Sequence, residues 1–151
     1  MSALPDRPNI LYIHSHDSGR YVQPYGYSVP TPNMQLLADQ GTLFRRAFCA
    51  APTCSGSRAA LLTGQHCHNN GMTGLAHRGW ELNDYGQHLV HPLKKAGYRT
   101  ILVGEQHISK DPGVIGYDEV RRLDSNLAGL VAPSALDAME NAQEPFFMSI
   151  G

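Results

Sequence analysis

The sequence has 151 residues, about the length of one domain, and a formal net charge of −1 from 12 Lys and Arg against 13 Asp and Glu. Hydrophobic residues make up 42% and charged residues 17%, which is typical of a globular protein and excludes a disordered one. A charge so close to zero gives no electrostatic reason to bind nucleic acid or an anionic membrane, so we expect neither as a partner.

The number of cysteines and the character of the first residues indicate a cellular compartment. The sequence contains three cysteines, Cys49, Cys54 and Cys67. This number is odd and is too small for a disulfide framework. No apolar run approaches the roughly 20 residues that span a bilayer, and the first residues lack the apolar core of a secretory signal. We therefore expect a cytoplasmic protein, with a periplasmic or secreted one as the alternative. Residues 1–6 are expected to be disordered.

The first third of the chain contains two strand-like stretches and a helix. Residues 7–14 form an apolar run rich in β formers and are expected to be a central strand. Residues 31–41 have a threonine cap, a proline at the first helical position and a terminal glycine, which predicts a helix. Residues 42–48 are expected to form a second strand that leads into a loop around Cys54.

Strands and helices also alternate in the remainder of the chain. Residues 65–83 are polar and predict a long loop. The helix predicted at 85–97 should become regular only near His91, because Pro92 is costly in a helix interior. The other expected elements are a strand at 98–104, a short strand near Tyr117, a helix at 133–141 and a strand at 144–150. This alternation predicts an α/β fold with a mostly parallel sheet and helices on both faces.

Cys54 lies in a stretch, residues 51–64, that we expect to deliver it to the mouth of a short helix beginning near Ser57 with a serine cap. The N-terminus of a helix has unpaired backbone N–H groups and the positive end of the helix dipole. Both favour a bound anion there, or a nucleophile that attacks an anion. Arg58 adds a planar donor fork suited to sulfate or phosphate oxygens. A buried free cysteine is the alternative interpretation, and we expect it for Cys49, in the core.

The stretch Cys54-Ser-Gly-Ser-Arg58, followed by Leu-Thr-Gly, resembles the signature of the sulfatases, Cys-x-Pro (or Ala)-x-Arg and then Leu-Thr-Gly. In that family the cysteine is oxidised to formylglycine, whose hydrate attacks the sulfur of a sulfate ester or sulfamate and later expels sulfate. The resemblance implies that Cys54 is the formylglycine precursor and that Arg58 positions it. Gly56 departs from the family pattern, which bears on recognition by the maturation enzyme.

His16 and Asp17 follow the first strand, where a carboxylate suits a hard divalent cation. Pro8-Asn-Ile-Leu with His16-Asp17 and Gly19 resembles the family's Pro-Asn-Ile…Asp-Asp-x-Gly, in which both aspartates bind calcium or magnesium. The resemblance implies a metal site of Asp17, His16 and the modified Cys54. Ca²⁺ is the first expectation, with Mg²⁺ or a transition metal as alternatives, since imidazole suits softer metals. Alternatively His16 has only a structural role.

Gly104-Glu-Gln-His107 resembles the family's Gly-Lys-x-His, in which the lysine and histidine contact the formylglycine and the sulfate. The resemblance implies that His107 bonds the nucleophile or transfers a proton. Glu105 replaces the lysine and reverses a charge beside an anionic substrate. It would contact substrate at a cost in sulfate affinity unless it points away or a different cation substitutes for the lysine.

The loop at 65–83 combines Cys67 with several histidines, but adjacent ligands such as His66-Cys67-His68 rarely close a zinc tetrahedron. Its Asn70-Gly-Met72 portion resembles the heparan N-sulfatase (sulfamidase) branch of the family. By that resemblance His77 would line the substrate pocket.

The resemblance covers residues from about 7 to 150, while sulfatases are several times longer. It implies an incomplete alkaline phosphatase-like α/β/α sandwich: residues 1–151 would be the N-terminal part of the catalytic domain, inactive until the remainder of the full-length chain completes the site. The implied activity is hydrolysis of a small-molecule or saccharide sulfate ester or sulfamate. Two alternatives remain. One is a phosphate or phosphonate ester hydrolase of the same superfamily, and the other is a degenerate, non-catalytic domain, motivated by the departures at His16, Gly56 and Glu105.

Overall fold

The computed structural model describes residues 7–151, so the disorder expected for residues 1–6 lies outside the described residues. The chain comprises two compact units, a smaller one of residues 15–49 and a larger one that holds 7–14 and 50–151. None of the helices in the described part of the chain has the length and apolar character needed to cross a membrane.

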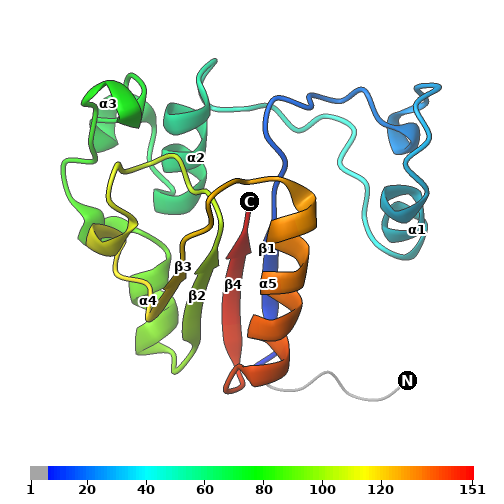
Figure 1. Ribbon diagram of the computed structural model, residues 1–151. Helices are drawn as coiled ribbons and strands as arrows, with labels where there is room; N and C mark the ends of the chain where they lie inside the picture. The colour runs from blue at the N-terminus through cyan, green and yellow to red at the C-terminus, as the bar shows by residue number, and fades with distance from the viewer. Residues whose placement is uncertain (1–6) are drawn as a thin grey trace. The chain divides into compact units, whose positions relative to one another are not determined.

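The larger unit is built on a four-stranded sheet in the order β1-β4-β2-β3, with every pair parallel (Figure 1). The strands are β1 (Ile10–Ile13), β2 (Arg99–Val103), β3 (Glu119–Arg121) and β4 (Phe146–Ile150). β4 lies between β1 and β2, and every one of its residues is buried because both of its faces are covered. The stretch expected to be a central strand is instead β1, which pairs with β4 at one edge and leaves Ile13 66% exposed.

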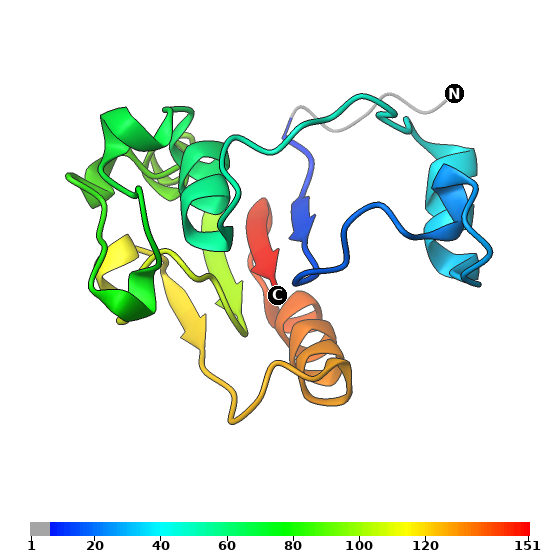
Figure 2. The same cartoon turned by 90° about the horizontal axis from the view of Figure 1, so that it is seen from above.

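Helices cover both faces of this sheet, as the alternation predicted. On one face α5 (Ala128–Asn141) packs Val131, Ala135 and Ala138 against side chains of β2 and β4. On the other face α2 (Cys54–Thr63) and α4 (Val90–Lys95) share a core with Leu102 and Phe147. Figure 2 shows α2 and α5 on opposite sides of the strands. Strands buried on both faces are continuous apolar runs, which explains why β2 and β4 were predicted close to their true bounds.

Several element bounds differ from the prediction. α5 begins at Ala128 and contains Pro133, because good helix formers on both sides outweigh the backbone hydrogen bond that proline cannot donate. β3 begins at Glu119, and Tyr117 is buried in the core instead. The remaining short elements are α3 (Cys67–Asn70), η2 (Ala76–Arg78), η3 (Tyr85–Gln87) and η4 (Pro112–Ile115). The stretch at 65–83 is therefore not wholly irregular, whereas the late start of α4 agrees with the effect expected of Pro92.

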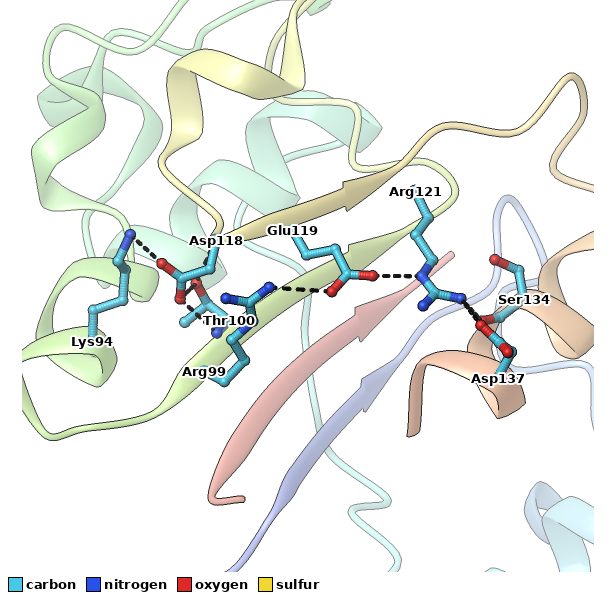
Figure 3. Close-up of polar contacts among 8 residues, drawn as sticks. All are labelled: Lys94, Arg99, Thr100, Asp118, Glu119, Arg121, Ser134 and Asp137. Carbon is cyan, nitrogen blue, oxygen red and sulfur yellow. Dashed lines mark hydrogen bonds and ion pairs between the residues drawn. The ribbon is translucent and has the colours of Figure 1, made fainter. Parts of the chain in front are cut away.

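The edge strand β3 is held by a row of ion pairs that runs from α4 to α5 (Figure 3). Lys94 of α4 lies 2.7 Å from Asp118, whose other carboxylate oxygen accepts the Thr100 backbone N–H and hydroxyl, each at 2.9 Å. Burial raises the pKa of Asp118, but Lys94 and Thr100 together hold it below its ordinary value. These contacts fix the start of β3 against β2.

The other half of this row centres on Arg121, whose side chain is 25% exposed. Its Nε donates to Glu119 at 2.6 Å, and its Nη1 lies 2.5 Å from Asp137 and donates to the Ser134 carbonyl at 3.0 Å (Figure 3). Glu119 also lies 3.3 Å from Arg99. One guanidinium therefore joins β3 to α5.

The smaller unit contains η1 (Gln23–Tyr25) and α1 (Pro32–Gln40), and α1 matches the predicted helix. Thr31 holds the N-cap position, but its hydroxyl accepts the Gln23 N–H at 3.0 Å instead of capping the helix. The strand expected at 42–48 is wrong: these residues pair with no strand, and Phe48 is 90% exposed. Residues with high strand propensity form a strand only where a neighbouring strand is available to pair with them. Cys49, expected in the core, is exposed.

Candidate active site

Cys54 is the first residue of α2, so the helix begins earlier than the predicted start near Ser57. Thr53 is extended (φ −107°, ψ 148°) and its carbonyl accepts the Ser57 N–H at 3.0 Å, which closes the first turn. The expected serine cap is absent, because Thr53 holds the N-cap position and both serines lie inside the helix. The buried Ser55 hydroxyl instead accepts the Ala76 N–H at 3.1 Å. Cys54 is half-buried at the positive end of α2, where an anion is favoured.

Gly56 fits a close approach between α2 and the segment that follows α3. A Cβ atom at this position would lie 3.0 Å from both the Met72 carbonyl oxygen and the Ala51 Cβ. The buried Cys67 thiol donates to the Gly56 carbonyl at 3.3 Å. This bond gives Cys67 a structural role.

Arg58 lies one turn after Cys54 and reaches the end of β1. Its Nη1 contacts the His14 ring at Nδ1 and lies 3.2 Å from Nε2. Because arginine is always protonated, the ring nitrogen that faces it accepts the hydrogen bond. Burial raises the pKa of Tyr12, whose ring centroid is 4.9 Å from that of His14, and the Arg58 charge opposes this shift. The sequence prediction gave His14 no role, although a histidine directly after a strand signals such a position.

His107 follows β2 in a turn that buried polar contacts hold. The Gln106 side chain is 4% exposed, and its Oε1 accepts the N–H groups of Ile108 at 2.5 Å and Ser109 at 3.0 Å. His107 has φ +58°, in the left-handed region that few residues other than glycine adopt. A ring nitrogen of His107 lies within 4.8 Å of Cys54 Sγ. The structure thus brings these two predicted catalytic residues together from distant parts of the chain.

The Glu105 carboxylate contacts the turn that Glu105 itself begins. One oxygen accepts the N–H groups of Gln106 at 3.2 Å and His107 at 3.3 Å, and the other lies 3.6 Å from His107 Nε2. Glu105 and Gln106 also line an open polar pocket of about 480 Å³, between the segments that follow β2 and β3. The prediction that Glu105 contacts substrate stays a prediction.

The other predicted site residues stay predictions as well. His16 Nδ1 lies 3.1 Å from an Asp17 carboxylate oxygen, within the smaller unit. A metal ion shared with Cys54 stays a prediction. His77 is exposed on η2, next to the Ala76 that bonds Ser55. Its place beside a substrate likewise stays a prediction.

The decisive comparison is with protein families. The profile of the family described as Sulfatase matches residues 8–150, nearly the whole chain. This chain belongs to the sulfatase family. The assignment confirms the resemblance carried by the Cys54, Asp17 and His107 stretches.

Several curated sulfatases are similar to this sulfatase chain. The arylsulfatase of Klebsiella aerogenes is 32% identical over 127 residues, which cover 78% of this chain and 27% of that protein. The human N-sulphoglucosamine sulphohydrolase is 37% identical over 106 residues, covering 68% of this chain and 21% of that protein. The human N-acetylgalactosamine-6-sulfatase is 38% identical over 126 residues, covering 74% and 24%. The chain therefore spans about a quarter of the length of these relatives.

Solved structures share the fold of this sulfatase chain. One, in complex with its substrate D-glucosamine-2-N,6-O-disulfate, superposes with a TM-score of 0.80 at 24% identity and covers 95% of this chain and 33% of that one. A putative sulfatase from Bacteroides thetaiotaomicron gives a TM-score of 0.72 at 20% identity, covering 95% and 34%. These likenesses confirm the predicted alkaline phosphatase-like α/β architecture.

Proposed function

We propose that the full-length protein is a hydrolase of sulfate esters or sulfamates, with a sulfated saccharide as the substrate class and Cys54 as the precursor of the nucleophile. The observation that carries this proposal is the meeting of Cys54 and His107, within 4.8 Å, at the N-terminus of α2. Family membership and the saccharide sulfatases among the relatives support the substrate class.

Each residue of the site has a role that its surroundings support. The maturation enzyme oxidises Cys54 to the formylglycine aldehyde, and addition of water gives a hydrate. One hydroxyl of this hydrate attacks sulfur as the alcohol or amine of the substrate departs, and the other then expels sulfate and restores the aldehyde. The N-terminus of α2 and the Arg58 guanidinium stabilise negative charge on the sulfate oxygens. The His14 ring holds Arg58 in place. His107 bonds the nucleophile or moves a proton during the reaction.

A divalent cation is part of the proposal, with Asp17 and His16 as ligands from this chain. Their neighbouring carboxylate and imidazole, 3.1 Å apart, form a donor set that fits such a cation. Ca²⁺ is the first candidate, and Mg²⁺ or a transition metal are the alternatives. A bound cation would polarise the sulfate oxygens. Further ligands would come from the rest of the full-length chain.

The test uses the full-length protein co-expressed with a formylglycine-generating enzyme. Peptide mass spectrometry measures conversion of Cys54, and hydrolysis is measured on an aryl sulfate, on glucosamine N-sulfate and on an aryl phosphate. We expect conversion and a preference for a sulfate or sulfamate substrate. Cys54→Ala should abolish turnover, whereas Cys49→Ala, at an exposed cysteine, is the matched control that should retain it.

Three results would overturn the proposal. A converted protein that prefers the phosphate ester would be a phosphate hydrolase of the same superfamily. Conversion without turnover of any of the three substrates, or a thiol that stays unmodified in the native host, would support the non-catalytic alternative.

A further inference from the structure

We propose that Glu105 is a positioning residue: it holds the turn that carries His107 and directs the His107 ring toward Cys54. This inference rests on the proposed function, in which the His107 ring acts beside the nucleophile. It changes the role expected of Glu105, which the sequence placed against the substrate.

The Glu105 carboxylate contacts both the backbone N–H and the side-chain ring of His107. Glu105 Oε1 accepts the backbone N–H of His107 at 3.3 Å, together with that of Gln106 at 3.2 Å. Glu105 Oε2 lies 3.6 Å from His107 Nε2, within ion-pair range but longer than a hydrogen bond. The backbone position and the ring direction of His107 therefore depend on the same side chain.

The turn needs this support because of its backbone conformation. His107 has φ +58°, and a residue with a Cβ atom stays in that region only where its surroundings hold it. Gln106 holds the far side of the turn through Ile108 and Ser109. Glu105 holds the near side.

An acid suits this position in a way that the family's lysine does not. A lysine ammonium has only donors, so it could not accept the two backbone N–H groups that Glu105 accepts. The Glu105 side chain is 40% exposed, against 26% for His107, so water screens its charge from a bound sulfate. Arg58 remains as the fixed positive charge of the site.

The test compares four single variants of the full-length, formylglycine-containing protein. Glu105→Gln keeps one acceptor for the backbone N–H groups but removes the charge that faces the ring. Glu105→Ala removes both, and Glu105→Lys restores the family residue. Glu140→Gln is the matched control, because Glu140 is an exposed glutamate on α5.

We expect kcat to fall about 10-fold in Glu105→Gln and about 100-fold in Glu105→Ala, the range seen when a supporting partner of a site residue is lost. KM should change little, and the control should match the wild type. Glu105→Lys should be no more active than Glu105→Ala. A rise in KM at constant kcat would instead identify Glu105 as a substrate contact, and a gain of activity in Glu105→Lys would overturn the proposal.

A double-mutant cycle tests whether Glu105 acts through His107. In a His107→Ala background, Glu105→Gln should cause no further loss of kcat, because the ring that it directs is gone. A full additional loss would contradict a positioning role.

Crystal structures of the wild type and Glu105→Gln proteins separate this inference from the proposed function. The His107 ring should turn away from residue 54 in the variant, and an unchanged ring would overturn the inference. This readout holds even if the converted wild type hydrolyses no sulfate, the result that would overturn the proposed function alone.

Discussion

The carbonyl oxygen of Met72 lies 3.0 Å from the place that a Cβ atom would occupy on Gly56. The segment after α3 therefore packs directly on the first turn of the helix that carries Cys54. A glycine here is a packing requirement of this chain, and it accounts for one departure from the sulfatase signature.

Gly56→Ala should destabilise the protein even though alanine favours a helix by about 1 kcal/mol over glycine. The added methyl group meets the Met72 carbonyl and the Ala51 Cβ, and overpacking of this kind costs about 1–3 kcal/mol. Gly129→Ala is the matched control, because nothing lies within 4 Å of a Cβ atom there. Urea denaturation should show a loss for the first variant and a gain for the second; equal gains would contradict the packing argument.

Gln106→Ala should lower the free energy of unfolding by about 2–3 kcal/mol. The substitution leaves the buried N–H groups of Ile108 and Ser109 without their acceptor, and each unpaired group carries a desolvation cost. Gln143→Ala, at an exposed glutamine, should change stability by less than about 0.5 kcal/mol. Chemical denaturation of both variants measures the difference, and a small loss at Gln106 would show that water replaces its bonds.

Stability should fall as the pH drops from about 6.5 to about 4, because of His88. Its ring is fully buried, and burial, with a smaller effect of the nearby His91, lowers its pKa from 6.5 to about 4. In this window the unfolded chain binds a proton that the folded protein does not, so stability rises with pH and about 3 kcal/mol is lost on acidification.

His88→Asn should flatten this pH dependence, since the asparagine carbonyl can still accept the Val90 N–H that His88 Nδ1 accepts at 3.1 Å. His68→Asn, at an exposed histidine of α3, is the control and should leave the slope unchanged. Denaturation midpoints from pH 4.5 to 7 test both, and equal slopes in wild type and His88→Asn would contradict the assignment.

Arg121→Ala should destabilise the protein by about 1–2 kcal/mol, because it breaks charge-assisted bonds to Glu119 and Asp137 and frees β3 from α5. Arg122→Ala provides the comparison: Arg122 pairs with Asp111, but its side chain is 64% exposed, and an exposed pair contributes little. Thermal unfolding at low and high salt should separate the two variants. A matching small effect of both would show that the row in Figure 3 adds no stability.

Much of the fold could be predicted from the sequence, because its strongest patterns are local. Apolar runs located β2 and β4, and the proline and glycine at its ends located α1. Pattern alone could not order the strands, so β1 was expected in the centre, although β4 takes that place. The strand expected at 42–48 failed because propensity does not reveal whether a partner strand exists.

The candidate site was predictable in part for a similar reason. Cys54, Arg58 and His107 belong to short motifs, and parallel strands and their loops gather such motifs at one edge of a sheet. The contact of His14 with Arg58 and the turn of the Glu105 carboxylate toward His107 depend on side-chain directions that no sequence spacing encodes.

The placement of β4 between β1 and β2 affects the order in which the protein can assemble during synthesis. Ile10 must wait for Phe147 to leave the ribosome before it gains this neighbour, so of the four strands described here β1 waits longest for its partner. Folding of this part of the chain should accordingly be slow and governed by distant pairing, with chaperones most needed before β4 emerges.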